Sequence, residues 1–234
     1  MNAFYYSLSY SLSYQSSELD WCEQNYIYSN NIVEFWNTIS SFAFFMILFW
    51  INMKHDKLNT VIICFLGVSS AYFHATLSLF GQILDELSIT IIIVKTIFKF
   101  NHIYDNTSIR QKILIYAFLI FQLYIQFIYP GINRFALLLY IIIFALKYKK
   151  ILKIKDHKYN YPTTIQNILD YWYKSLVYFI FAITCWILDF TCITFYINFH
   201  TIWHVLIVFS IFNIMKCINN YEQLLIMIVR QSKC

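Results

Sequence analysis

Three of the six histidines in this 234-residue chain fall in strongly apolar segments, where an ionisable side chain is costly. His200 and His204 are four residues apart, so in a helix their imidazoles lie on one face, one turn apart. His74 lies near the end of an earlier apolar segment. Three neutral imidazoles and a water form the coordination of a catalytic Zn²⁺ site. Each histidine alone would fit an ordinary buried imidazole bonded to a neighbouring helix, but the set of three favours a metal site.

Two further polar residues accompany these histidines. Asp85 begins the apolar segment that follows His74, and Ser70 lies one turn before His74 on the same helical face. A carboxylate beside a metal can hold the attacking water, take its proton and return it to a leaving amine. A serine hydroxyl can donate a hydrogen bond to the developing oxyanion or bind the metal directly. These residues predict hydrolysis, although helix packing would explain Ser70 equally well.

A second polar group precedes the first apolar segment. Asp20, Glu23, Asn25 and Glu34 supply oxygen atoms of the kind that Ca²⁺ prefers. Their spacing is not that of an EF-hand, so helix capping and solvated acidic residues are the alternative interpretation.

The composition predicts that membrane helices position these residues. Apolar residues make up 60% of the chain and charged residues only 12%, and the three glycines and two prolines are too few for a turn-rich soluble fold. A bilayer core of about 30 Å needs roughly 17 to 25 mostly apolar helical residues. Seven segments meet this requirement: Val33 to Met53, Thr60 to Phe80, Ile83 to Phe100, Ile113 to Tyr129, Ile132 to Tyr148, Tyr173 to Leu188 and Phe199 to Lys216.

The basic residues predict the orientation of this seven-helix bundle, because they are costly to translocate in short loops. Only Arg134 of the 17 Lys and Arg residues falls on one side of the predicted membrane, and the rest fall on the other. The amino terminus is therefore predicted to be lumenal or extracellular and the carboxyl terminus cytosolic. This orientation brings Asp85 and the three apolar histidines to one depth. The basic loop 149–172 fits a phospholipid-facing anchor and not a nucleic-acid interface.

The chain is predicted to form one domain, residues 1–234, of the all-α integral membrane class. An amino-terminal arm, residues 1–32, lacks a basic n-region and is not a cleavable signal peptide. The transmembrane bundle covers residues 33–218, and a cytosolic tail covers residues 219–234. Within this tail, the apolar stretch 221–229 is too short to span and is predicted to continue the last helix or to lie at the interface.

Two cysteines fall on the predicted non-cytosolic side, where a disulfide would be stable. Cys22 precedes the first apolar segment and Cys192 lies between the sixth and the seventh. From their positions alone, a disulfide and two unrelated thiols are equally compatible with the sequence.

Four ordered blocks, spread from residue 20 to residue 204, resemble the alkaline ceramidases. The blocks are Asp20-Trp21-Cys22-Glu23-Gln24-Asn25-Tyr26 followed by Glu34-Phe35-Trp36-Asn37-Thr38, Ser70-Ala71-Tyr72-Phe73-His74-Ala75-Thr76-Leu77, Asp85-Glu86-Leu87, and His200-Thr201-Ile202-Trp203-His204. Thr201 and Ile202 differ from the small and aromatic residues that the family places between its last two histidines. The spacing from Asp189 to Cys192 is one residue shorter than the family pattern.

The resemblance implies a seven-helix fold with two metal sites. A catalytic Zn²⁺ would be held by His74, His200 and His204. Asp85 would lie at the catalytic water and Ser70 at the oxyanion. A structural or regulatory Ca²⁺ would be held by four side chains and one backbone carbonyl, those of Asp20, Glu23, Asn25 and Glu34 and that of Trp21. The resemblance also implies a disulfide between Cys22 and Cys192.

The implied activity is hydrolysis of the N-acyl amide of ceramide, taken from the bilayer, to a sphingoid base and a free fatty acid. The implied location is an endomembrane, the endoplasmic reticulum or the Golgi, and no protein partner is inferred. Two alternatives stay open. One is a related seven-helix zinc hydrolase that acts on another lipid, and the other is a receptor-like membrane protein without catalysis.

Overall fold

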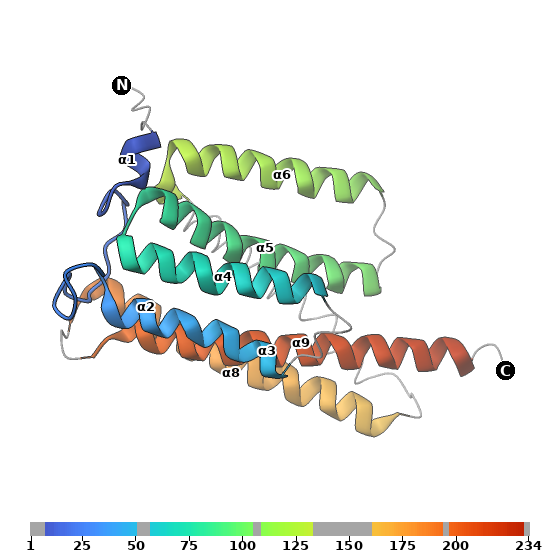
Figure 1. The fold of residues 1–234 in the computed structure, drawn as a ribbon. Helices are drawn as coiled ribbons and strands as arrows, with labels where there is room; N and C mark the ends of the chain where they lie inside the picture. Colours follow the sequence, from blue (N-terminus) through green and yellow to red (C-terminus); the bar gives the residue numbers. More distant parts are fainter. Residues whose placement is uncertain (1–7, 51–56, 105–108, 133–160, 194–196, 232–234) are drawn as a thin grey trace.

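The described part of the chain consists of helices with connecting turns and a non-helical arm, and it contains no strand. The computed structural model describes residues 8–50, 57–104, 109–132, 161–193 and 197–231. The helices lie roughly side by side (Figure 1) and are, in chain order, α1 (Leu8–Leu12), α2 (Phe35–Ser41), η1 (Phe42–Phe45), α3 (Met46–Trp50), α4 (Lys57–Thr76), α5 (Leu79–Tyr104), α6 (Ile109–Ile128), η2 (Pro130–Ile132), α8 (Pro162–Thr191) and α9 (Phe199–Gln231). The all-α fold class that the sequence predicts is therefore confirmed.

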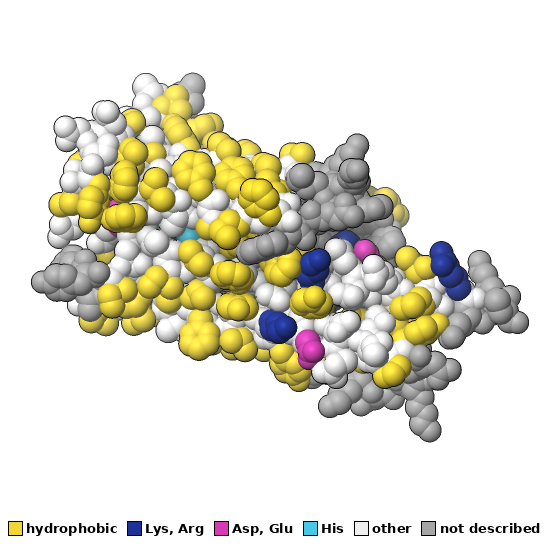
Figure 2. Space-filling view, turned by 60° about the horizontal axis from the view of Figure 1, so that its bottom comes forward, with side chains coloured by type: hydrophobic (Ala, Val, Ile, Leu, Met, Phe, Trp, Pro, Cys, Tyr) yellow, Lys and Arg dark blue, Asp and Glu magenta, His cyan; other side chains and the backbone are white. Residues whose placement is uncertain are grey.

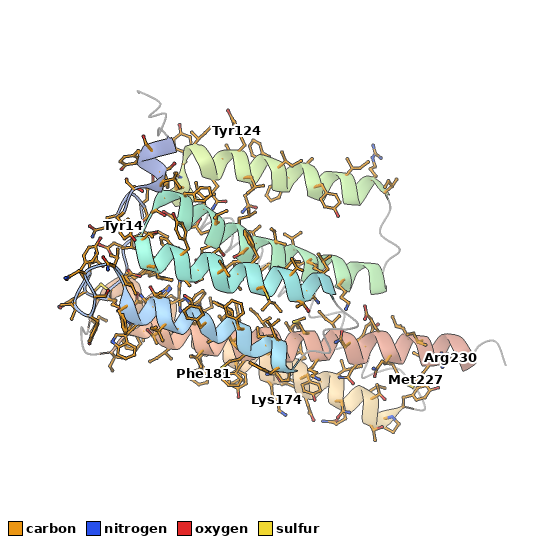
Figure 3. All side chains as sticks on the ribbon, in the orientation of Figure 1. Tyr14, Tyr124, Lys174, Phe181, Met227 and Arg230 are labelled. Carbon is orange, nitrogen blue, oxygen red and sulfur yellow. A yellow bond between two sulfur atoms is a disulfide. The ribbon has the colours of Figure 1, made fainter. Side chains whose placement is uncertain are left out.

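Three of these helices are long and apolar enough to cross a membrane: Leu58–Thr76, Pro162–Thr191 and Phe199–Ile228. Large apolar side chains also lie on the outside of the bundle, as a protein solvated by lipid requires. Phe49 is 87% exposed and Phe181 is 60% exposed, and hydrophobic side chains cover much of the face in Figure 2. Figure 3 shows Phe181 on the outer side of α8.

The predicted count of seven spans and the predicted orientation stay predictions. The fifth predicted span, apart from its first residue, lies outside the described residues, as do Arg134 and residues 149–160 of the predicted basic loop. The second half of that predicted loop is helical, because α8 begins at Pro162 and not at Tyr173, where the sixth span was predicted to start. The stretch 221–229 is part of α9, so the prediction of a helical continuation is confirmed.

The predicted second span, Thr60 to Phe80, ends too late. The structure ends α4 at Thr76 and begins α5 at Leu79, with Leu77 in the left-handed region at φ 45°. Ser78 caps the new helix, because its Oγ accepts a hydrogen bond from the amide of Gly81 at 3.1 Å. A Cβ at Gly81 would lie 2.9 Å from the Cα of Phe73, so glycine permits the close approach of α5 to α4. This tight turn makes α4 and α5 antiparallel neighbours.

The amino-terminal arm is fixed to the carboxyl-terminal end of α4. The carbonyls at a helix end have no partner within the helix. Here the arm supplies the missing donors, through amides of Gln15, Ser17, Val33 and Glu34 that bond to the carbonyls of residues 76, 77, 75 and 74 at 2.9 to 3.1 Å. The arm therefore lies against the end of the bundle at which α4 ends (Figure 1).

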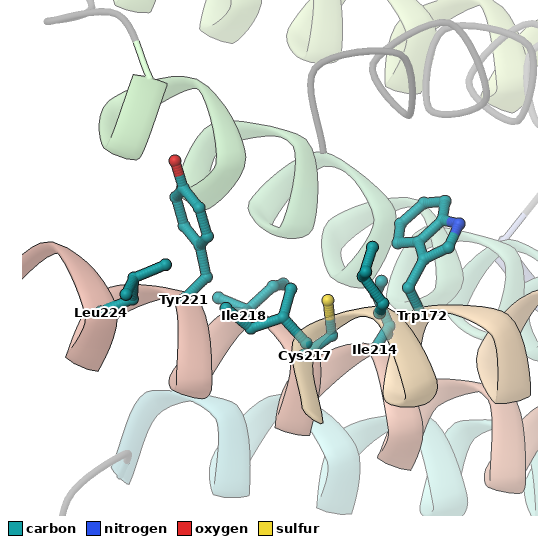
Figure 4. Packing of buried hydrophobic residues seen from close by; sticks show 8 residues of the cluster. Trp172, Ile214, Cys217, Ile218, Tyr221 and Leu224 are labelled. Carbon is teal, nitrogen blue, oxygen red and sulfur yellow. The ribbon is translucent and has the colours of Figure 1, made fainter. Parts of the chain in front are cut away.

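Helices α8 and α9 form the most extensive helix pair in the described chain. Near the middle of α8, Ser175 and Ser210 each donate from Oγ to the carbonyl of the other at 3.0 Å, which joins the two helices by reciprocal hydrogen bonds. The neighbouring part of the interface is apolar and is shown in Figure 4, with Trp172, Ile214, Cys217, Ile218, Tyr221 and Leu224. This packing fixes α9, which carries two of the three histidines.

The structure contains a disulfide between Cys22 of the arm and Cys192, which caps the end of α8. It closes a sequence separation of 170 residues, for which the chain-entropy model gives a stabilisation of about 5 kcal/mol, while typical disulfides stabilise by about 2–4 kcal/mol. We expect Cys22→Ser together with Cys192→Ser to lower the thermal unfolding midpoint by several degrees, measured on protein purified without reductant. The matched control is Cys64→Ser with Cys185→Ser, which removes two free thiols. An unchanged midpoint in the first variant would contradict a stabilising role for this bond.

Candidate metal centre

Three histidines from two helices converge at the arm end of the bundle. His74 lies in the last turn of α4, and His200 and His204 lie in the first turns of α9. All three side chains are buried, and the nitrogen atoms that they offer lie within 4.8 Å of one another. We call this group the histidine trio. Among the described residues it is the only group of three or more His, Cys, Asp or Glu side chains arranged to hold a metal ion.

Hydrogen bonds orient two of the three imidazoles. The Nδ1 atom of His74 lies 2.6 Å from a carboxylate oxygen of Glu34, and the Nδ1 atom of His204 lies 2.6 Å from Oγ of Ser40. The Nε2 atoms of both rings are buried and have no hydrogen-bond partner. Metal-binding histidines use one ring nitrogen for the metal and the other for a carboxylate, carbonyl or similar group. Buried polar atoms without a partner are rare. The two Nε2 atoms therefore fit metal ligands.

The third imidazole is held by packing. The ring of His200 lies against the indole of Trp21, with ring centroids 3.9 Å apart. The carboxylate of Asp189 accepts a hydrogen bond from the backbone amide of His200 at 3.2 Å and lies 3.9 Å from its Nδ1 atom. Asp189 also accepts from the amide of Cys22 at 3.4 Å. The arm, the end of α8 and the start of α9 are thereby joined around one ligand.

Ser40 offers the most direct test of this arrangement. Replacement of Ser40 by alanine removes the group that holds the His204 ring, and loss of such a partner weakens metal binding by about 10- to 100-fold. We expect a loss of that size in zinc affinity, measured by competition with a chromogenic chelator. Ser69→Ala is the matched control, since Ser69 is also buried but bonds to Leu66 and Ser88. Equal zinc affinity in the two variants would show that Ser40 has no role in zinc binding.

Ser70 and Asp85 lie on the neighbouring helices α4 and α5. Ser70 is one turn before His74 on α4, and Asp85 lies in the second turn of α5, which the tight turn brings back against α4. Both side chains are buried. Ser41 donates to Ser70 at 3.1 Å. Atom Oδ1 of Asp85 is buried without a partner, so an acceptor is free for a proton or a water.

The neighbouring carboxylate, Glu86, lies in a different environment. It accepts hydrogen bonds from Gln82 at 3.0 Å and from Gln126 of α6 at 2.9 Å. Glu86 therefore joins α5 to α6, and the two adjacent acids of the sequence have separate surroundings.

The acidic residues of the arm do not converge as the histidines do. Glu23 accepts hydrogen bonds from the amides of Trp36 and Asn37 at 2.6 and 2.8 Å, which caps the start of α2. Burial raises the pKa of the Glu23 carboxyl above its ordinary value and outweighs these hydrogen bonds, which lower it. Asp20 contacts Asn25, whose Oδ1 atom is buried without a partner. Glu23 thus acts as a helix cap. The proposed calcium ligands of the arm do not converge on one point as the three histidines do.

Thr201, which departs from the family pattern, takes part in the site. Its Oγ1 donates to Oδ1 of Asn37 at 3.1 Å, and Nδ2 of Asn37 donates to Glu34 at 3.0 Å. Glu34 in turn contacts the ring of His74. The threonine between the two histidines of α9 is therefore linked to the orientation of the histidine of α4.

Three residues of the site were missed or given another role from the sequence. Ser40 was not singled out, Asp189 had no role, and Glu34 was expected only at calcium. A signal for two of them existed. Polar residues are unusual in a membrane span, yet the first predicted span contains Glu34, Asn37, Thr38, Ser40 and Ser41 within eight residues.

Comparisons with known proteins point to a single family. A family model described as Ceramidase matches residues 13–227. Alkaline ceramidase 1 of Mus musculus is 33% identical over 229 aligned residues, which cover 83% of this chain and 76% of that protein. Alkaline ceramidase 1 of Homo sapiens is 31% identical, with 83% of this chain and 79% of that protein covered. Alkaline ceramidase of Drosophila melanogaster is 46% identical over a shorter stretch, 32% of this chain and 30% of that protein.

Proposed function

This chain belongs to the ceramidase family, and we propose that it hydrolyses the N-acyl amide of ceramide with a zinc ion held inside the membrane. The products are a sphingoid base and a free fatty acid. The observation that carries the zinc proposal is the pair of buried, unpartnered Nε2 atoms on rings whose Nδ1 atoms contact Glu34 and Ser40.

The trio would hold the zinc ion through one nitrogen of each imidazole. Three buried and adjacent imidazoles repel one another when protonated, and burial also disfavours their charged form, so neutral rings with lone pairs suit this site. Zinc held by three histidines supplies a Lewis acid that activates water and polarises the amide carbonyl.

Asp85 is proposed to move the proton. Hydrolysis forms a bond between the oxygen of water and the carbonyl carbon, and it breaks the bond from that carbon to nitrogen. The free Oδ1 atom of Asp85 can accept the proton of the attacking water and deliver it to the departing amine. The reaction then needs no other proton donor.

Ser70 is proposed to stabilise the negative oxygen that develops on the carbonyl. Because Ser41 donates to Ser70, the hydroxyl of Ser70 keeps its own proton for donation. In the reaction this proton would be offered to the oxyanion.

Calcium is proposed for the arm, with Asp20, Glu23, Asn25 and Glu34 as side-chain ligands and the carbonyl of Trp21 as the fifth. Two observations support it. The Oδ1 atom of Asn25 is buried without a partner, and Glu23 and Glu34 lie within electrostatic range of each other. Because Glu34 also contacts His74, a calcium ion bound to the arm would affect the orientation of this zinc ligand.

We place the enzyme in an endomembrane, the endoplasmic reticulum or the Golgi, as a single domain of seven helices with the histidines toward the lumen. The apolar residues on the outside of the described helices support a membrane location. Ceramide has two hydrocarbon chains, so it would reach the site from within the bilayer.

The activity is tested by incubating the purified chain with ceramides that are labelled in the acyl chain, in phospholipid nanodiscs. We expect labelled fatty acid to be released, and we expect no release from a phospholipid that carries the same acyl chain in ester linkage. Failure to cleave every ceramide of a panel, in protein with a full complement of zinc, would contradict ceramide as the substrate.

A further inference from the structure

A groove opens between α4, α5 and α9, away from the arm. It is a shallow groove that is partly open to the surroundings. Its walls combine an apolar floor with polar groups at one end: Asn59, Ile62, Ile63, Ile92, Lys95, Thr96, Lys99, Ile211, Ile214, Met215, Ile218 and Asn219. We call it the lysine groove. It is separate from the zinc site, because the apolar cluster of Phe44, Leu66 and Val208 is packed between the two levels.

The polar end of the lysine groove lies about one membrane thickness from the histidines. Along α9, Asn219 follows His200 by 19 positions, which is about 28 Å at about 1.5 Å per residue. The hydrocarbon core of a bilayer is about 30 Å thick. Asn59 precedes His74 on α4 by 15 positions, or about 22 Å. The polar end of the groove is therefore at the opposite membrane boundary, where lipid head groups are found.

The described lining of the lysine groove carries two basic side chains. Lys95 and Lys99 are one helical turn apart on α5 and line the groove together. Lys95 bonds to Oδ1 of Asn59, and Lys99 lies 3.3 Å from Oδ1 of Asn219. No acidic residue is among the described lining residues, and Lys99 also forms an ion pair with Glu222 at 3.2 Å, outside the lining. Two ammonium groups above an apolar floor match an anionic head group with its glycerol and acyl chains below.

We propose that the lysine groove binds the head group of an anionic phospholipid from the leaflet at that boundary, and that this lipid braces the helices of the catalytic site. The three walls are the helices that carry Ser70, Asp85 and His204. A lipid that contacts all three at one end restrains their relative positions at the other. The apolar floor favours a lipid over a free phosphate, which would leave seven apolar side chains uncovered. The bracing part of the proposal rests on the proposed function, whereas the binding part does not.

The test measures lipid binding and not hydrolysis. Purified protein in phosphatidylcholine nanodiscs is titrated with phosphatidylserine, and retained lipid and the thermal midpoint are recorded by native mass spectrometry and by a melting assay. We expect phosphatidylserine to be retained and to raise the midpoint, and we expect inorganic phosphate to do neither. Lys95→Gln with Lys99→Gln should weaken retention by about fivefold for each lysine. Zinc content checks that the variant is folded.

Two comparisons make the result specific. Lys174→Gln removes an exposed lysine of α8 outside the groove (Figure 3) and should behave as the wild type. Lys95→Arg with Lys99→Arg keeps both charges and should keep phosphatidylserine binding. The proposal is overturned if the glutamine pair retains phosphatidylserine as well as the wild type does, or if phosphatidylserine and phosphatidylcholine bind equally. Because ceramide is absent from this assay, its outcome is independent of whether the enzyme cleaves ceramide.

Discussion

Replacement of His204 by alanine is expected to abolish zinc binding and to reduce ceramide hydrolysis by at least about a thousandfold. The reason is that a metal acting as Lewis acid supplies several kcal/mol of transition-state stabilisation, and about 1.4 kcal/mol corresponds to a factor of ten in rate. The His204 ring is fully buried against Ser40 and the other histidines, so alanine removes one of the three ligand nitrogens from the site. Bound metal and fatty-acid release are measured on the same preparation.

The matched control for this variant is Ile202→Ala. Ile202 lies on the same turn of α9 but is 40% exposed and does not belong to the trio. It should keep its zinc and its activity. Full hydrolysis by His204→Ala, in a preparation that melts as the wild type does, would show that the trio is not the catalytic centre.

The second large effect is expected for Asp85→Asn, which should lower the rate of hydrolysis by about 10²- to 10⁴-fold while zinc stays bound. Asparagine has nearly the shape of aspartate but cannot accept and return a proton, and general acid–base catalysis contributes a factor of this size. The carboxylate is buried, and its Oδ1 atom has no hydrogen-bond partner. Rates are compared at saturating ceramide, so that the chemical step is measured.

Glu86→Gln is the natural comparison, because it removes a carboxylate one residue away in the same helix. Glu86 is hydrogen-bonded to Gln82 and Gln126 and has no place in the proposed proton transfer. We expect it to lower the thermal midpoint and to keep most of the rate per folded molecule. If Glu86→Gln lost as much rate as Asp85→Asn at full zinc occupancy, the assignment of the proton to Asp85 would be wrong.

The composition of the site was predictable because its chemistry is unusual for the surrounding sequence. Imidazoles and a carboxylate are costly in lipid, so His74, Asp85 and the pair on α9 stand out against apolar neighbours. Helical periodicity then places His200 and His204 on one face. The structure brings these three histidines together, and a resemblance in four blocks of sequence agrees with the family match over residues 13–227.

The orienting contacts were not predictable, because they join distant parts of the chain. Ser40 and His204 are 164 positions apart, and Glu34 and His74 are 40 apart. Neither spacing follows from a local pattern. A serine in a helix more often packs than bonds to a catalytic residue. The carboxylate of Glu34 suits a calcium ion, and only the fold shows that it also contacts the ring of His74.

The boundary between α4 and α5 was predicted four residues too late for a physical reason. Hydropathy does not fall across Leu77, Ser78 and Leu79, so a window of apolar residues continues through the turn. The signal that marks the break is the cap, since Ser78 is followed three residues later by Gly81, whose amide it accepts. The turn matters for function, because it sets Asp85 back against the helix that carries Ser70 and His74.

Ceramide hydrolysis is proposed to require a zinc ion bound at the histidine trio. Metal analysis of the purified wild-type protein tests this requirement most directly. We expect about one zinc per chain, loss of hydrolysis when a strong chelator removes the zinc, and recovery when zinc alone is added back. The calcium content of the same protein tests separately whether the arm binds Ca²⁺. Protein that hydrolyses ceramide at its full rate with no zinc bound would contradict the claim.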